Sequence, residues 1–111
     1  RKKARMYIDK LEGIPYIKLP KIREGADPVW HIFSVLAENR DDIIQKFRLN
    51  GIQYGIHYPV PLHLQKAYNY KCYNRGVFPV TEEVAEHQLS LPFWPEMKEQ
   101  EIYRIGKCII A

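Results

Sequence analysis

The sequence VWHIFSVL, residues 29–36, is rich in β-branched and aromatic side chains. Such a run is typical of a strand that is buried on much of both faces. Two shorter apolar segments, residues 52–57 and 89–91, also read as strands, and Pro92 ends the second of them. Short strands cannot hide their apolar faces alone, so we expect these three to form a small, mostly antiparallel sheet that helices cover.

Four further segments carry apolar residues at the spacing of an amphipathic helix. They are residues 4–11, 39–50, 79–89 and a last segment that follows Pro95 and includes Ile109. Asn39 can cap the second helix, and Gly51 can end it in the left-handed conformation. Residues 14–28 and 58–76, which are rich in proline or aromatic residues, are expected to be extended or irregular. The predicted fold is α+β, a two-layer sandwich with the helices packed on one face of the sheet.

Length and composition restrict the class of protein. The 111 residues, 46% hydrophobic and 27% charged, fit a single folded domain. No apolar run approaches the ~20 residues of a membrane-spanning helix, so we expect no membrane partner. The net charge of +4 comes from basic residues mixed with acidic ones, which argues against nucleic acid as a partner. Two cysteines are too few for a disulfide framework and indicate a cytoplasmic protein with reduced thiols.

The first helix pattern begins without a residue that could cap it. No Ser, Thr, Asp or Asn precedes Ala4, and these are the residues whose side chains satisfy the free N–H groups of a first helical turn. We therefore expect the chain to be a fragment of a longer protein, with the natural start of this helix missing.

Residues that could carry chemistry gather in GIHYPVPLHLQKAY, residues 55–68, directly after the second predicted strand. His57 and His63 can hydrogen-bond a phosphate or a hydroxyl, or transfer a proton near neutral pH. Two prolines stiffen the turn between them, which lowers the entropy cost of presenting side chains outward. Histidines in a proline-rich loop are more often packed or solvated groups, so a purely structural role stays open.

Other kinds of site find little support. The four histidines and Cys72 lack the short spacings of zinc ligands, so no metal is expected. Lys71 could activate the Cys72 thiol, but no base and orienting group accompany it. The sequence contains no glycine-rich phosphate loop and no G-x-S-x-G motif. The residues alone therefore predict no self-contained active site.

The run IHYPVPLHLQ at residues 56–65 resembles a signature of the DegT/DnrJ/EryC1/StrS family, the pyridoxal-phosphate-dependent sugar aminotransferases. The other matching segments, in chain order, are WHIF at 30–33, GI at 51–52, FPVTEE at 78–83 and LSLP at 89–92 with Pro95. The His-Tyr-Pro run is the specific part, and the rest is supportive because all of it occurs in the family's order. The resemblance covers nearly the whole chain.

The resemblance implies that residues 1–111 are the C-terminal small domain of a fold type I aminotransferase, without the large cofactor-binding domain. In this family a lysine of the large domain holds pyridoxal 5'-phosphate, so no lysine of this chain is assigned a catalytic role, and the fragment alone is expected to be inactive. The parent enzyme would be a cytoplasmic homodimer. It would transfer an amino group, usually from glutamate, to a nucleotide-linked keto sugar for polysaccharide, lipopolysaccharide or antibiotic biosynthesis.

The resemblance also implies where the substrate would bind. His57, Tyr58 and His63 become candidates for contacts with the sugar or its phosphates, and Gln65 is a weaker one. His31 matches the family's first strand, where a structural role is at least as well supported. Lys98 stands where the family usually has a helix-capping Thr or Ser, which should weaken the last helix by about 1 kcal/mol.

Two alternatives remain open. The first is a free-standing module that binds nucleotide sugars or a partner protein. The second is the small domain of a sugar dehydratase of the same family, which uses the same cofactor. Gln53 and Tyr54 depart from the small residue or threonine that is common in the family, which leaves the sugar specificity open.

Overall fold

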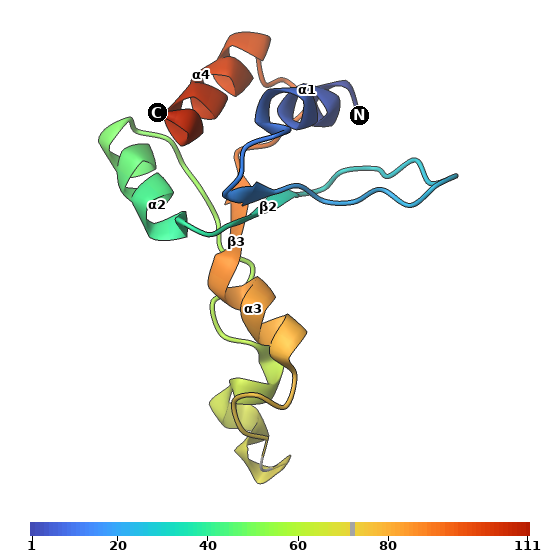
Figure 1. The fold of residues 1–111 in the computed structure, drawn as a ribbon, viewed down its shortest axis with the longest axis vertical. Helices are drawn as coiled ribbons and strands as arrows, with labels where there is room; N and C mark the ends of the chain where they lie inside the picture. The colour runs from blue at the N-terminus through green and yellow to red at the C-terminus, as the bar shows by residue number, and fades with distance from the viewer. Residues whose placement is uncertain (72) are drawn as a thin grey trace.

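The computed structural model of the chain describes residues 1–71 and 73–111. The helices and strands are α1 (Lys2–Leu11), β1 (Ile17–Lys18), β2 (Phe33–Ala37), α2 (Arg40–Leu49), η1 (Leu62–Leu64), η2 (Lys66–Lys71), α3 (Pro79–His87), β3 (Gln88–Leu91) and α4 (Glu99–Ile110). Within the described residues, β1, β2 and β3 form one antiparallel sheet with β2 in the middle (Figure 1). The predicted α+β class is confirmed.

The two faces of the sheet differ in chemistry. Every second residue of β2 is buried, beginning with Phe33 and ending with Ala37. On β3, Leu91 lies opposite Phe33, so both side chains point to the same face. Ser34 and Ser90 also lie opposite each other and point to the other face. One face therefore carries the apolar core, and the other carries a polar pair.

The strand boundaries predicted from the sequence are only partly correct. β2 begins four residues later than the predicted strand at 29–36, because its partner β3 ends at Leu91, opposite Phe33. The predicted strand at 52–57 is wrong. Only Gly55 pairs there, with Ser90, and the N–H group of His57 donates to a side chain instead of a strand carbonyl.

β1 lies inside the segment that was predicted to be an extended connector. It has two residues, which is too short for an alternating pattern to appear in the sequence. Ile17 pairs with Ala37, and the carbonyl oxygen of Tyr16 accepts the N–H of Glu38 at 3.1 Å. These bonds add an edge to the sheet beside β2.

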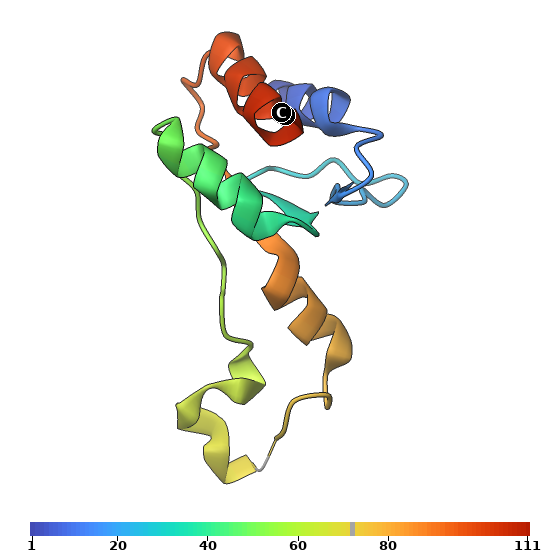
Figure 2. The ribbon, with the colours of Figure 1, turned by 60° about the vertical axis from the view of Figure 1, so that its left-hand side comes forward.

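α1, α2 and α4 cover the apolar face of the sheet (Figures 1 and 2). Tyr7 of α1 stacks on Phe33 with ring centroids 5.0 Å apart, and its hydroxyl donates to the carbonyl oxygen of Pro92 at 2.8 Å. The core cluster consists of Ala4, Tyr7, Leu11, Ile17, Phe33, Val35, Ala37, Ile43, Ile44, Phe47, Ile52, Leu89, Leu91, Met97, Ile102, Ile105 and Ile109. Helices on one face of the sheet are the arrangement predicted. None of the described helices is long and apolar enough to cross a membrane.

α2 and α4 begin close to the predicted residues, but their capping hydrogen bonds differ from those expected. α2 begins after Asn39, but the Asn39 side chain makes no capping hydrogen bond, and its buried Oδ1 has no partner in the described part of the chain. α4 begins after Lys98, where the Glu101 carboxylate accepts the Lys98 backbone N–H at 2.6 Å. This bond is one half of a capping box and offsets part of the loss of a Ser or Thr at position 98.

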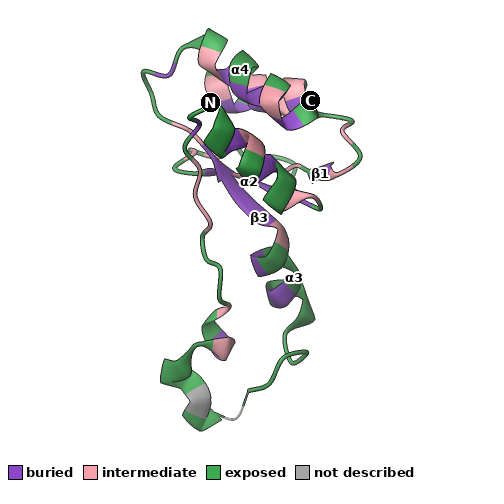
Figure 3. Cartoon of the chain, turned by 90° about the vertical axis from the view of Figure 1, so that its left-hand side faces the viewer, coloured by how far each residue is buried: buried purple, intermediate pink, exposed green. Residues whose placement is uncertain are grey.

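Residues 58–71 and 73–87 project from the rest of the molecule (Figures 2 and 3), and we call them the arm. We call residues 1–57 and 88–111 the body. The projection raises the radius of gyration to 15.5 Å, whereas a compact domain of this length has about 13 Å. Arg40 anchors the arm to the body, because its Nη1 donates to the carbonyl oxygen of Ala85 near the end of α3 at 2.8 Å.

α3 differs from its predicted form. Val80 and Val84, two residues of its expected apolar stripe, are 72% and 39% exposed. Leu89, a third, belongs to β3 and lies in the core instead. A short helix with apolar residues on a face that this chain does not cover is typical of a contact surface.

Candidate functional site

His57 lies on the polar face of the sheet, at the junction of the body and the arm. Its backbone N–H donates to Oε1 of Gln88 at 2.7 Å, and Nδ1 of its ring lies 2.9 Å from Oγ of Ser90. The ring also rests against Gly55, where an added Cβ would come within 2.5 Å of Cε1 of the imidazole. These contacts position the ring, although the residue as a whole is exposed.

Three polar side chains of the sheet form a network behind His57. Nε2 of Gln88 lies 2.9 Å from Oγ of Ser34 and 2.6 Å from Oγ of Ser90, and the two Oγ atoms are 3.0 Å apart. Gln88 and Ser90 are each only 4% exposed. Buried polar groups of this kind are costly unless they are bonded, and here each has partners.

The sequence analysis missed these three residues. Ser34 lies inside a run that was predicted to be buried on much of both faces, and Gln88 was assigned to the preceding helix. The signal that could have found Ser90 is the alternation in LSL, residues 89–91, because a polar residue between two core residues of a strand must point to the opposite face.

Tyr58 and Gln65 both face solvent. Tyr58 is 72% exposed, and its ring lies edge-on to that of His57 with centroids 5.6 Å apart. Gln65 is exposed just after η1, where its backbone N–H donates to the carbonyl oxygen of Leu62 at 3.2 Å. The ring of Tyr58 therefore lies beside the ring of its chain neighbour His57, and Gln65 lies further along the arm.

His63 is buried inside the arm. Nε2 of its ring lies 3.0 Å from Oε1 of Glu82, and the two side chains are 7% and 8% exposed. The ring also packs edge-on against Phe78, with centroids 4.9 Å apart. His63 therefore joins η1 to α3 and faces Glu82, not solvent.

Glu82 is the centre of the hydrogen bonds in the arm. Its two carboxylate oxygens accept the backbone N–H of Gly76 at 2.8 and 2.9 Å, and Oε1 also lies 3.4 Å from the N–H of Phe78. The Gly76 bond, followed by the bonds from His63 and Phe78, holds the pKa of the Glu82 carboxyl below its usual value despite burial. An ionised Glu82 thus closes the loop before α3 onto the helix.

The other candidate ligands and nucleophiles do not gather. His31 is exposed just before β2, and Nδ1 of His87 donates to the carbonyl oxygen of Glu83 at 2.9 Å. Cys72 lies outside the described residues, so the structure gives no account of it. Within residues 1–71 and 73–111, no three His, Cys, Asp or Glu side chains are arranged to hold a metal ion.

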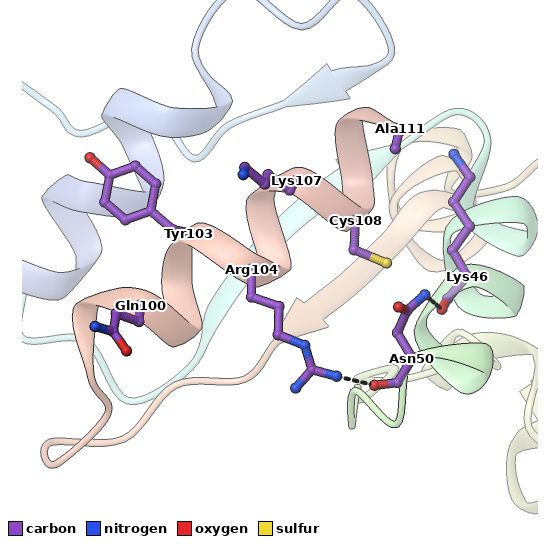
Figure 4. Close-up of a pocket in the computed structure, with 8 residues that line it drawn as sticks. All are labelled: Lys46, Asn50, Gln100, Tyr103, Arg104, Lys107, Cys108 and Ala111. Atoms are coloured by element: carbon purple, nitrogen blue, oxygen red, sulfur yellow. Dashed lines mark hydrogen bonds between the residues drawn. The ribbon is translucent and has the colours of Figure 1, made fainter.

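An open groove of about 850 Å³ lies between α2 and α4 (Figure 4). Lys46, Arg104 and Lys107 line it together with the half-buried Cys108. The Arg104 guanidinium donates to the backbone carbonyl oxygen of Asn50. None of the four predicted substrate contacts lines this groove.

The lysines of the chain do not fit the role of cofactor anchor. A lysine that forms a Schiff base is usually desolvated or placed beside another cation, which lowers the pKa of its amine. No lysine of this chain is buried, and the ammonium of Lys3 is bound to the carbonyl oxygens of Pro95 and Met97. We therefore derive no cofactor chemistry from these residues.

Comparisons with known proteins match nearly the whole chain. The model of the DegT/DnrJ/EryC1/StrS aminotransferase family matches residues 1–110. The chain is 38% identical over 102 residues to the dTDP-3-amino-3,4,6-trideoxy-alpha-D-glucose transaminase of Streptomyces venezuelae, covering 92% of this chain and 27% of that protein. It is 35% identical over 109 residues to the UDP-N-acetyl-3-dehydro-alpha-D-glucosamine 3-aminotransferase of Acidithiobacillus ferrooxidans, covering 98% and 29%.

Solved structures agree with these matches. The crystal structure of S. venezuelae DesV in complex with a ketimine intermediate superposes with a TM-score of 0.92 at 36% identity, covering 97% of this chain and 29% of that one. A DegT DnrJ EryC1 StrS aminotransferase from Brucella abortus gives a TM-score of 0.85 at 34% identity, covering 98% and 29%. The chain thus spans less than a third of the relatives it matches. It belongs to the DegT/DnrJ/EryC1/StrS aminotransferase family.

Proposed function

We propose that residues 1–111 are the C-terminal small domain of a pyridoxal-phosphate-dependent enzyme that transfers an amino group from glutamate to a nucleotide-linked keto sugar. The observation that supports the enzyme family is the match over residues 1–110, and the C-terminal position rests on the resemblance of the His-Tyr-Pro run at residues 57–59. The names of the similar proteins support a nucleotide-linked sugar, because they include a dTDP-sugar transaminase and a UDP-sugar aminotransferase. The products would serve polysaccharide, lipopolysaccharide or antibiotic biosynthesis in the cytoplasm.

The large and small domains of the proposed enzyme would have different roles. The cofactor supplies the electron sink of such reactions, and the protein positions it and the substrate. The resemblance to the family implies that a lysine of the large domain holds the cofactor, so that part of the complete polypeptide would do so, within a homodimer. The small domain would close over the substrate and exclude water from it.

We assign the substrate contacts to the junction between body and arm. His57 and Tyr58 are exposed and adjacent there, and both can hydrogen-bond a sugar hydroxyl or a phosphate oxygen. Gln65 would be an outer contact from the exposed surface of the arm. His63 would act on the substrate indirectly, by holding the arm in place, because its ring nitrogen already bonds Glu82.

The test uses the complete polypeptide that contains these residues. With pyridoxal phosphate, glutamate and a dTDP- or UDP-linked keto sugar, we expect one 2-oxoglutarate released for each amino sugar formed. His57→Ala and Tyr58→Phe should raise the KM for the sugar about tenfold, since each removes a hydrogen bond to it. Glu83→Gln on the exposed side of α3 is the matched control and should leave KM unchanged.

Other outcomes of the same assay would overturn the proposal. A dehydrated sugar formed without consumption of glutamate would identify a dehydratase of the family instead. Tight binding of the nucleotide sugar by residues 1–111 alone, with no amino transfer by the complete polypeptide, would identify a free-standing binding module.

A further inference from the structure

The hydrogen bonds around His57 determine which nitrogen of its ring carries the proton. A backbone N–H can only donate, so the N–H of His57 requires the oxygen of the Gln88 amide, which lies 2.7 Å away. This contact sets the orientation of the amide. Its nitrogen then faces Ser34 and Ser90, and each of its two hydrogens is donated to one serine oxygen.

The hydroxyl hydrogens follow from this arrangement. The two Oγ atoms are 3.0 Å apart, so one serine donates to the other. If Ser34 donates to Ser90, the hydrogen of Ser90 is free to point at Nδ1 of His57, 2.9 Å away. Every hydrogen of the network then has an acceptor within it. The reverse direction leaves the Ser34 hydroxyl hydrogen without an acceptor in this network.

We propose that Ser90, held in place by Gln88, is a positioning residue that fixes His57 in the neutral tautomer with its proton on Nε2. Nδ1 then accepts a hydrogen bond from Ser90, and the hydrogen bond made by one ring nitrogen decides the state of the other. In the described part of the chain Nε2 of His57 has no hydrogen-bond partner. His57 therefore presents an N–H donor to solvent.

This inference extends the proposed function. Only the identity of the ligand rests on that function. An outward N–H recognises an acceptor oxygen and rejects a donor. In the complete enzyme we assign that oxygen to the nucleotide sugar, as a phosphate oxygen or a hydroxyl oxygen. Gly55 also contributes to the position of the imidazole, because the ring packs against its backbone. An alanine at position 55 would displace Cε1 of the ring.

The direct test is a nitrogen-15 NMR measurement of the histidine rings in residues 1–111, at about pH 8.5, where an ordinary imidazole is neutral. We expect Nε2 of His57 to have the chemical shift of a protonated nitrogen and Nδ1 that of an acceptor. A protonated Nδ1 would overturn the proposal. This measurement needs no variant, so it does not depend on whether a variant folds.

Two serine variants then separate the roles of the network. Ser90→Ala removes the donor to Nδ1, so the single tautomer should give way to a mixture. Ser34→Ala is the matched control, because it also removes one hydroxyl but leaves that of Ser90 in place, and it should preserve the tautomer. If Ser90→Ala leaves the ring state unchanged, Ser90 does not set it.

Kinetics of the complete polypeptide test the ligand assignment. Ser90→Ala and Gly55→Ala should each lower kcat/KM for the nucleotide sugar about tenfold or more, as loss of an orienting partner does elsewhere. The KM for glutamate and the Kd for pyridoxal phosphate should not change, whereas a general structural defect would alter all three. A raised Kd for pyridoxal phosphate with an unchanged sugar KM would overturn the assignment to the sugar.

The two proposals fail in different ways. If the complete polypeptide transfers no amino group, the proposed function is wrong, but the tautomer of His57 is still measurable in residues 1–111. If amino transfer occurs and Nδ1 carries the proton, the proposed function stands and the present inference is wrong.

Discussion

The body of the molecule buries Tyr7, Phe33 and Phe47 completely, whereas the side chains buried in the arm include an ionisable pair, His63 and Glu82. More than half of the exposed large apolar side chains of the described residues lie in the arm. They are Tyr58, Val60, Leu62, Tyr68, Tyr70, Tyr73, Val77, Phe78, Val80 and Val84. The same chain thus contains one region with its own core and one region whose apolar surface is uncovered.

The difference teaches how each region is stabilised. Folding of the body removes a continuous cluster of apolar side chains from water, which is the main driving force of folding. The arm relies on directional bonds around one carboxylate, which hold a shape but add little apolar burial. Large exposed apolar patches usually mark a contact surface, and the relatives of this chain are more than three times its length. Under the proposed function, the arm is the region that the rest of the complete polypeptide would cover.

The largest effect should come from the core of the body. Phe33 is fully buried and lies against Tyr7, Trp30 and Phe93, with ring centroids 5.0 to 6.0 Å away. Phe33→Ala should lower the free energy of unfolding by about 3–5 kcal/mol, as measured by urea denaturation. Leu49→Ala, at an 87% exposed position, is the control and should change it by less than about 0.5 kcal/mol. Equal effects of the two would contradict the description of the body.

The next effect should be confined to the arm. Glu82→Gln keeps the size of the side chain but removes the charge that the N–H of Gly76 and the ring of His63 bond. Amide hydrogen exchange at Gly76 and Phe78 should become faster, while exchange in β2 stays as it was. Glu83→Gln changes the next residue, which is exposed, and should leave exchange at Gly76 and Phe78 unchanged. Faster exchange throughout the body after Glu82→Gln would show that arm and body are one cooperative unit.

Acid should loosen the arm in the same way. The pKa of Glu82 is lowered from 4.5, mainly by the N–H of Gly76, so the folded arm favours the ionised form. Its contribution to stability is therefore present above 4.5 and is lost as the pH falls through the lower pKa of the folded state. The amide resonance of Gly76 should report this loss in an NMR titration. Loosening as the pH rises through neutrality would contradict it.

A smaller effect is expected within the body, where α1 contacts the end of β3. The hydroxyl of Tyr7 donates to the carbonyl oxygen of Pro92 at 2.8 Å, and burial raises the pKa of this phenol. Tyr7→Phe keeps the stacking on Phe33 and removes one hydrogen bond, so it should cost about 1 kcal/mol in urea denaturation. Tyr103→Phe, at a 54% exposed position, is the control. A cost of several kcal/mol would contradict this, because it would mean that the hydroxyl contributes more than one ordinary hydrogen bond.

The sequence predicted the body better than the arm. The spacing of Tyr7 and Leu11 in α1, or of Ile102 and Ile109 in α4, reports a covered helix face, and the structure covers both. The same reasoning placed Val84 toward a core that this chain does not supply. Periodicity identifies an apolar face but does not say which molecule or segment covers it.

The candidate site was predicted only in its outer part. His57 and Tyr58 stand out because they belong to the His-Tyr-Pro run, the specific part of the resemblance to the family. Ser34 and Gln88 do not stand out, because nothing in a linear sequence indicates that they meet 54 residues apart. The register of β2 and β3 makes that contact, and it becomes visible only once these two strands, far apart in the chain, are paired.

We propose that the arm is a contact surface of a larger aminotransferase. Hydrogen–deuterium exchange of residues 58–71 and 73–87 tests it directly, when residues 1–111 alone are compared with the complete polypeptide. We expect strong additional protection of the arm in the complete polypeptide and unchanged protection of β2 and α4. Equal exchange of the arm in both would contradict the account.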